Sequence, residues 1–196
     1  MAEFPVLITP RLALRAFRPT DAAAVYAIFS REAVTRYVNR ETMRSMQEAD
    51  ELVAVRASVW QRNLGARWAI TLRGGDDTVI GSCGYYNVDR ANCCVEIGYD
   101  LHPARWRQGI MTEALTAMLD YCYGATFAFR LNRVLALTEL DNVASMALLC
   151  KLGFQDEGVR RECGYWRNVF HDLRGFSLLR REWEARLVPA GNGERA

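Results

Sequence analysis

Apolar residues recur every three or four positions in four segments of the chain, the spacing that places them on one face of an α-helix. The first helix is expected after Pro19, the second over Gln47–Asn63, and the third and fourth after Gly109 and Asn142, the last ending at Gly153. Proline suits the first turn of a helix, and glycine is a common stop signal after the last turn.

Between the helices, short runs of β-branched and aromatic residues predict strands separated by polar turns. The predicted strands are Leu12–Phe17, Arg67–Leu72, Val79–Tyr86, Cys94–Leu101, Val134–Thr138, Gln155–Trp166 and His171–Arg181. The run from residue 67 to 101 reads as an antiparallel three-stranded meander. The whole pattern predicts one mixed α/β (α+β) domain over residues 1–188, in which a single sheet is flanked by helices, with residues 189–196 as a frayed tail.

Composition narrows the function classes. The chain has 196 residues, of which 51% are hydrophobic and 24% charged, as in ordinary globular proteins. The net charge is only +2 and no basic block stands out, so nucleic acid is not expected as a partner. No run approaches ~18 apolar residues and no signal segment is recognised, so we expect no membrane insertion and a cytoplasmic protein.

The six cysteines are expected to be reduced, and most of them to be small core residues. No C-x-x-C motif occurs, and only His102 and His171 could add imidazole ligands. We therefore expect no metal site.

The segment Tyr99–Ala114 joins a strand to a helix through a loop that contains Arg105, Arg107 and Gly109. The first N–H groups of a helix lack internal partners, and the helix dipole makes that end electropositive. The joint is therefore suited to bind a pyrophosphate. The alternative is a plain turn with solvated arginines. The segment is not a P-loop, because G-x-x-x-x-G-K-[ST] is absent.

A second segment, Asn142–Phe154, begins with an asparagine that can cap a helix and carries Ser145 in the first turn. On its own this segment reads as a capped helix with a glycine terminus.

Together these motifs resemble the GNAT superfamily of acetyl-CoA-dependent N-acetyltransferases, and within it the ribosomal-protein N-terminal (RimJ/RimL-type) branch. The resemblance covers residues 9–183 and rests on four motifs in the family's order. They are Thr9–Arg15, Glu96–Tyr99, the loop and helix start with Met111–Ala114, and the N-x-x-S…K-x-G-F segment, followed by the ending His171–Trp183.

The resemblance implies a mostly antiparallel sheet in which the strand Cys94–Leu101 and the strand Arg133–Thr138 lie parallel and splay apart. Acetyl-CoA would lie in that V. The positions that would hold it are the backbone of Tyr99 and Leu101, the N–H groups of Gln108, Gly109, Ile110, Met111 and Thr112, the side chains of Arg105 and Arg107, and Asn142 with Ser145.

The chain departs from the family pattern at three positions. The phosphate loop is commonly [RQ]-x-x-G-x-[GA], but Trp106 and Met111 occupy its first and last places here. We interpret both as features of the branch, because the backbone donors remain. Leu149 stands where many GNAT enzymes have a tyrosine that protonates the leaving thiolate, and the resemblance assigns that role to Ser145.

The resemblance implies direct attack of an amine on the thioester, without an acyl-enzyme. An amine is mostly protonated at neutral pH, so the reaction needs a proton acceptor. Glu96 is the first candidate, acting through water, although it could simply be a surface carboxylate. Glu162 and Asp172 are reserve candidates, and Asp172 could instead anchor a loop. Asn142 and Ser145 complete the predicted catalytic set.

The most plausible acceptor by this resemblance is the α-amino group of a protein N-terminus. The alternatives are a small-molecule amine, such as an antibiotic, toxin or amino-acid derivative, and a module that binds acetyl-CoA without catalysis. A homodimer is possible, because terminal strands in such folds often pair.

Overall fold

The computed structural model describes residues 3–186, and its elements follow the hydrophobic periods of the sequence. The strands are β1 (Leu7–Ile8), β2 (Leu12–Arg15), β3 (Ala66–Leu72), β4 (Gly81–Asp89), β5 (Cys94–Leu101), β6 (Arg133–Glu139), β7 (Gln155–Trp166) and β8 (Val169–Leu179). The helices are α1 (Ala22–Phe29), α2 (Glu32–Thr35), α3 (Met46–Gln61), α4 (Ile110–Tyr123), α5 (Val143–Lys151) and α6 (Arg180–Ala185). The predicted frayed tail, 189–196, lies outside the described residues.

The last predicted strand runs too far, because the chain changes from strand to helix after Leu179. The Glu182 side chain accepts a hydrogen bond from the Leu179 N–H at 2.9 Å, which starts α6. The indole of Trp183 is buried and donates to Asp120 Oδ1 at 3.0 Å. The hydrogen bond between Leu179 and Glu182, three residues later, and the buried indole of Trp183 therefore stabilise a helix where the β-rich run predicted a strand.

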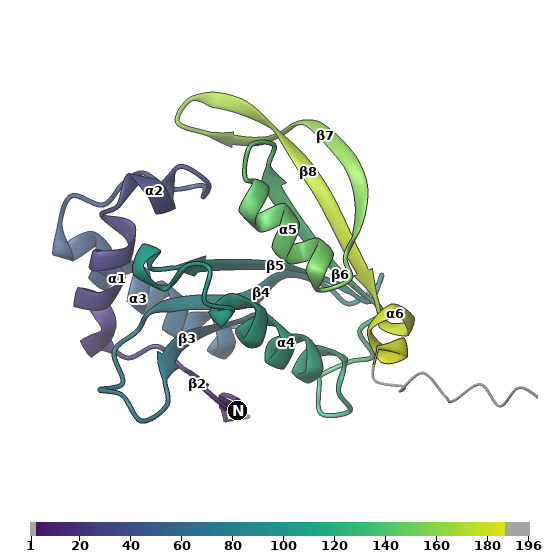
Figure 1. The fold of residues 1–196 in the computed structure, drawn as a ribbon, viewed down its shortest axis with the longest axis horizontal. Coiled ribbons are helices and arrows are strands. Elements are labelled where there is room, and N and C mark those ends of the chain that lie inside the picture. The colour runs from purple at the N-terminus through teal and green to yellow at the C-terminus, as the bar shows by residue number, and fades with distance from the viewer. Residues whose placement is uncertain (1–2, 187–196) are drawn as a thin grey trace, which may run out of the picture.

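All eight strands form one sheet in the order β1-β2-β3-β4-β5-β6-β8-β7 (Figure 1). Every neighbouring pair is antiparallel except β5 and β6, which are parallel. The predicted meander is confirmed as β3-β4-β5, and the mostly antiparallel sheet with one parallel pair is confirmed as well.

The parallel pair opens partway along its length. The register of β5 with β6 ends at Ile97 opposite Ala136, although β5 continues to Leu101 and β6 to Glu139. Beyond that point β5 remains paired with β4, and β6 remains paired with β8. The facing edges of β5 and β6 are therefore left without a strand between them, which is the splayed V that the resemblance implied.

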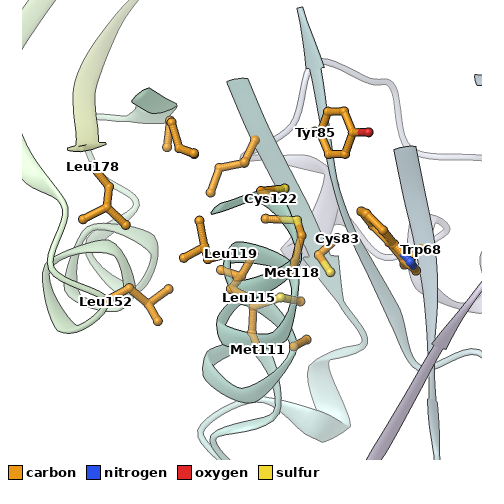
Figure 2. Close-up of a cluster of buried hydrophobic side chains, with 14 of the residues drawn as sticks. Trp68, Cys83, Tyr85, Met111, Leu115, Met118, Leu119, Cys122, Leu152 and Leu178 are labelled. Atoms are coloured by element: carbon orange, nitrogen blue, oxygen red, sulfur yellow. The ribbon is translucent and has the colours of Figure 1, made fainter. Parts of the chain in front are cut away.

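Helix α4 covers one face of the sheet. Figure 2 shows its stripe of Leu115, Met118, Leu119 and Cys122 directed at side chains of the strands, with Trp68 among them. All five of these side chains are fully buried. Leu149 of helix α5 and Leu152, the residue after its end, belong to the same cluster.

Helices α1 and α3 cover the other face, where apolar residues such as Val25, Phe29 and Val53 form a second cluster. The two clusters alternate along β3, since Trp68 and Ile70 belong to the first and Ala69 to the second. The gap between β5 and β6 therefore lies between a face covered by α4 and a face covered by α1 and α3.

Six free cysteines are found, but the expectation that most lie in the core is wrong. Cys83 and Cys122 are buried, whereas Cys150 and Cys163 are exposed. Leu149 and Leu152 are buried against the core, and the Cys150 side chain lies on another side of the helix. Cys150 is therefore exposed. None of the helices within residues 3–186 has the length and apolar composition needed to cross a membrane.

Candidate active site

A cleft of about 1500 Å³ passes between the splayed strands and is lined from both faces of the sheet. From the α4 and α5 face it is lined by residues including Arg107, Thr112 and Ser145. From the α1 and α3 face it is lined by residues including Arg56 and Tyr86. Two reactants can therefore approach the V from opposite sides of the sheet.

One end of the cleft is the start of α4. Gly109 is the N-cap and has a φ of +71°, a left-handed conformation that glycine adopts without strain. No side chain caps this helix, so its first N–H groups face the cleft as open donors. Of the predicted loop positions, Arg105, Arg107, Gly109, Ile110, Met111 and Thr112 line the cleft. The Gln108 side chain instead donates to the Ala104 carbonyl oxygen at 2.8 Å.

Arg11 ties the N-terminal segment to this loop, a role that the sequence did not reveal. Its Nη1 donates to the Gln108 carbonyl oxygen at 3.0 Å, and its Nε donates to the Glu113 carboxylate at 2.6 Å. Thr9 also donates to Glu113, at 2.5 Å. Glu113 lies in the first turn of α4, so these contacts fix the helix start and neutralise a carboxylate beside it.

The start of α5 lies across the V from β5. Asn142 is its N-cap and accepts a hydrogen bond from the Ser145 N–H at 3.1 Å. The Ser145 hydroxyl lies 2.6 Å from the Tyr99 hydroxyl. Burial raises the pKa of Tyr99 to about 12, although the Ser145 contact opposes the shift, so the phenol is protonated at neutral pH. Leu149 is fully buried in the core and adds no polar group to the cleft.

Glu96 lies on the opposite side of β5. Its carboxylate accepts hydrogen bonds from the Tyr86 hydroxyl at 2.7 Å and from Asn87 Nδ2 at 3.2 Å. Burial and the adjacent carboxylate raise the pKa of Tyr86, which keeps it a donor to Glu96. Because successive strand residues alternate between faces, Glu96 and Tyr99 point to opposite sides of the sheet. A carboxylate and a protonated phenol thus flank the V from its two sides.

A buried charged cluster supports the Glu96 side of the cleft. Asp100 Oδ2 accepts hydrogen bonds from Arg56 at 2.9 Å, from Arg67 at 2.5 Å and from Ser82 at 2.5 Å. Burial alone would raise the pKa of Asp100, but the two guanidinium groups outweigh it and leave the pKa below its usual value. Burial lowers the pKa of Arg56 to about 10.

The reserve candidates do not line the cleft. Asp172 Oδ1 accepts a hydrogen bond from the Glu162 N–H at 2.7 Å, at an irregularity in the pairing of β7 with β8. Asp172 therefore anchors the backbone there, as the sequence allowed.

Glu139, which the sequence did not single out, does line the cleft, and its carboxylate lies 3.1 Å from His171 Nδ1. The His171 ring stacks on Trp166 with a centroid distance of 3.9 Å. Burial raises the pKa of Glu139, although His171 opposes the shift. His102 is engaged elsewhere, accepting a hydrogen bond from the Ala104 N–H at 3.2 Å.

The tip of the β7–β8 hairpin reaches across to the segment after α2 (Figure 1). Arg167 donates to the carbonyl oxygens of Thr35 and Arg40 at 3.2 and 3.1 Å, and lies 3.6 Å from the Glu41 carboxylate. Tyr165 and Trp166 beside it line the cleft. These contacts join the hairpin tip to the segment after α2, where Arg40 also lines the cleft.

Within residues 3–186, no three His, Cys, Asp or Glu side chains gather in an arrangement that could hold a metal ion.

Comparisons with known proteins agree with this geometry. A family model described as an acetyltransferase (GNAT) domain matches residues 11–155. The chain is 36% identical to the uncharacterized N-acetyltransferase YoaA of Bacillus subtilis over 177 residues, 90% of this chain and 98% of that protein. It is 25% identical to the ribosomal-protein-serine acetyltransferase of Escherichia coli over 104 residues, 53% of this chain and 56% of that protein.

Among solved structures, the chain is similar in fold to RimL, described as a ribosomal L7/L12 α-N-protein acetyltransferase in complex with coenzyme A. The TM-score is 0.77 at 20% sequence identity, and the match covers 89% of this chain and 98% of that one.

Proposed function

The chain belongs to the GNAT acetyltransferase family and is an N-acetyltransferase, and from this premise we propose that it transfers the acetyl group of acetyl-CoA to the α-amino group of a protein N-terminus. The observation that carries the proposal is the cleft through the sheet, which has an open helix N-terminus at one end and Glu96 on the far face. Acetyl-CoA and the acceptor amine can therefore approach each other from opposite faces of the sheet. The reaction is proposed in the cytoplasm, as expected from the sequence.

The residues around the V suit acetyl-CoA, which supplies the acetyl group when bound. The open N–H groups from Gly109 to Thr112 would hold its pyrophosphate, with Arg105 and Arg107 adding positive charge. The free edges of β5 beyond Ile97 would hold its extended arm in the way that a sheet edge accepts an added strand.

Proton transfer needs one group on each face of the sheet. Glu96 would accept the proton of the acceptor ammonium, directly or through water, since only the neutral amine is nucleophilic. Ser145 would donate a hydrogen bond to the departing sulfur, with Tyr99 supplying a proton behind it. The Asn142 side chain would hold Ser145 in place by accepting a hydrogen bond from the Ser145 backbone N–H.

The protein N-terminus is proposed as the acceptor because of two relatives. The E. coli relative is named for acetylation of ribosomal-protein serine, and RimL for α-N-acetylation of L7/L12. The Glu96 side of the cleft is lined by side chains of α1, α3 and the β7–β8 hairpin, which together give an extended surface for the first residues of a chain.

A small-molecule amine is the second candidate, and the bridge from Arg167 to Thr35 and Arg40 favours it. A cleft bridged by Arg167 in this way would admit a compact acceptor more readily than a folded protein.

The test is an acceptor panel with purified, reduced protein and acetyl-CoA. The panel contains short lysine-bearing peptides with a free α-amino group and the same peptides blocked at the N-terminus, in which lysine offers the only amine. It also contains small amines, including a polyamine. Release of coenzyme A thiol gives rates, and mass spectrometry locates the acetyl group. We expect α-amino acetylation of the free peptides and none of the blocked ones. Turnover confined to small amines would contradict the protein acceptor.

A further inference from the structure

Gly98 is the first residue of β5 beyond its paired stretch with β6, and it lines the cleft on the same face as Glu96. A Cβ added at this glycine would lie 3.2 Å from Arg67 Nη1 and 3.2 Å from the Tyr86 ring. The bare backbone at the opening of the V is therefore flanked by a guanidinium group on one side and a phenol on the other.

The Arg67 guanidinium is fixed by two of its three nitrogens. Nε donates to Ser82 Oγ at 2.9 Å, and Nη2 donates to Asp100 Oδ2 at 2.5 Å. In the part of the chain that the structure describes, Nη1 has no hydrogen-bond partner, and the Arg67 side chain lines the cleft. Nε and Nη2 thus hold the guanidinium group in place, and Nη1 faces Gly98.

The phenol on the other side connects to the proposed proton acceptor. The Tyr86 hydroxyl lies 3.7 Å from the added Cβ position and donates to Glu96 Oε1 at 2.7 Å. A hydrogen-bond donor with positive charge and a carboxylate acceptor therefore flank one small area of exposed backbone.

We propose that this area recognises an α-aminoacyl group, with Arg67 Nη1 donating to the carbonyl or carboxylate oxygen and the amine directed toward Glu96. The inference rests on the proposed function and specifies its acceptor. In an α-aminoacyl group the amine and the oxygen are attached to adjacent carbons, so one donor and one acceptor on a small patch can bind both. A free amino acid and a peptide N-terminus share this chemistry, whereas a plain alkylamine lacks the oxygen.

The charge of the cluster adds to this selection. Arg56 and Arg67 share a single carboxylate, Asp100, so these three groups have a net positive charge beside the position proposed for the acceptor oxygen. This charge attracts the acceptor oxygen through a charge-assisted hydrogen bond.

The experiment compares four acceptors: alaninamide, free alanine, a dipeptide with N-terminal alanine, and isopropylamine. In isopropylamine a methyl group replaces the carboxamide of alaninamide, so the carbonyl oxygen is absent. Kinetics are measured with wild-type protein and with Arg67→Lys, which keeps the charge toward Asp100 but cannot keep all three donors in place. We expect Arg67→Lys to raise the KM for alaninamide and the dipeptide by about tenfold or more, as for a lost hydrogen bond to a charged group. The KM for isopropylamine should rise much less than the KM for alaninamide, because isopropylamine has no oxygen for Arg67 Nη1 to bind.

Gly98→Ala is the second variant, because its methyl group would occupy the area without removing a charge. It should raise the KM of oxygen-bearing acceptors more than the KM of isopropylamine, because the methyl group would lie between Arg67 Nη1 and the Tyr86 ring. Equal KM changes for alaninamide and isopropylamine in both variants would overturn the inference and leave the proposed function standing. Failure of the wild-type protein to acetylate any α-amino peptide would instead overturn the proposed function. Free alanine preferred over the dipeptide would identify the amino acid as the source of the α-aminoacyl group.

Discussion

The hydroxyl groups of Tyr99 and Ser145 lie 2.6 Å apart, although the two residues are 46 positions apart in the sequence and belong to β5 and α5. The buried Tyr99 is protonated at neutral pH because its pKa is about 12. In the proposed reaction, a proton that Ser145 gives to the leaving sulfur would be replaced from Tyr99 across this hydrogen bond.

Replacing Ser145 by Ala should lower kcat by about tenfold, less than the ~100-fold typical of general acid catalysis, because a thiolate is already a fair leaving group. Tyr99→Phe should lower kcat by a similar factor with no change in the KM for acetyl-CoA. Because the two hydroxyls act together, the double variant should be no slower than the slower single variant. Steady-state kinetics check this, and multiplicative losses would show that the hydroxyls act independently.

Replacing Glu96 by Gln should lower kcat by about 100-fold at neutral pH, because the amide cannot take the proton of the acceptor amine. Acetyl-CoA affinity, measured by isothermal titration calorimetry, should not change. Glu162→Gln is the matched control, since Glu162 is an exposed glutamate outside the cleft lining. A loss of activity in the control equal to that of Glu96→Gln would transfer the role to the hairpin carboxylate.

Local signals in the sequence were enough to predict the loop and the two helix starts on the side of the cleft where acetyl-CoA is proposed to bind. The loop before α4, its glycine and the Asn142 cap are each contained within a few consecutive residues, and the structure has these elements where they were expected. The strand alternation in Cys94–Leu101 also predicted β5 with its bounds.

On the proposed acceptor side, Glu96 was predicted, but the cluster around it could not be, because its contacts join residues far apart in the sequence. Asp100 meets Arg56 and Arg67 only when α3, β3 and β5 have packed together. Isolated arginines read as solvated surface charges, and nothing in their spacing indicates a shared carboxylate. The pairing of Glu139 with His171 likewise depends on the antiparallel register of β6 with β8.

Replacing Arg11 by Ala should weaken acetyl-CoA binding about tenfold, the effect of losing roughly 1.4 kcal/mol of support for the phosphate loop. The variant leaves Glu113 without its main partner beside the helix start, where a bound pyrophosphate would meet its negative charge. Titration calorimetry measures the affinity. Arg73→Ala is the control, because Arg73 holds the same N-terminal segment through the Thr9 carbonyl oxygen but not the loop. Equal losses in both variants would mean that the segment as a whole, and not Arg11, supports binding.

Asp100 should make the fold sensitive to acid. Its folded-state pKa is below the ordinary 3.8, so its contribution to stability is complete above that pH and is lost as the pH falls through the folded value. Asp100→Asn should lower the free energy of unfolding at pH 7 by about 3–5 kcal/mol, because it leaves two buried guanidinium groups without their carboxylate. The gap between wild type and variant should narrow below pH 4, since the wild type then loses the same charge. Urea denaturation across pH checks both points, with the exposed pair of Asp156 and Arg174 as a reference in Asp156→Asn. A gap that stays constant with pH would show that the charge of Asp100 does not hold the cluster together.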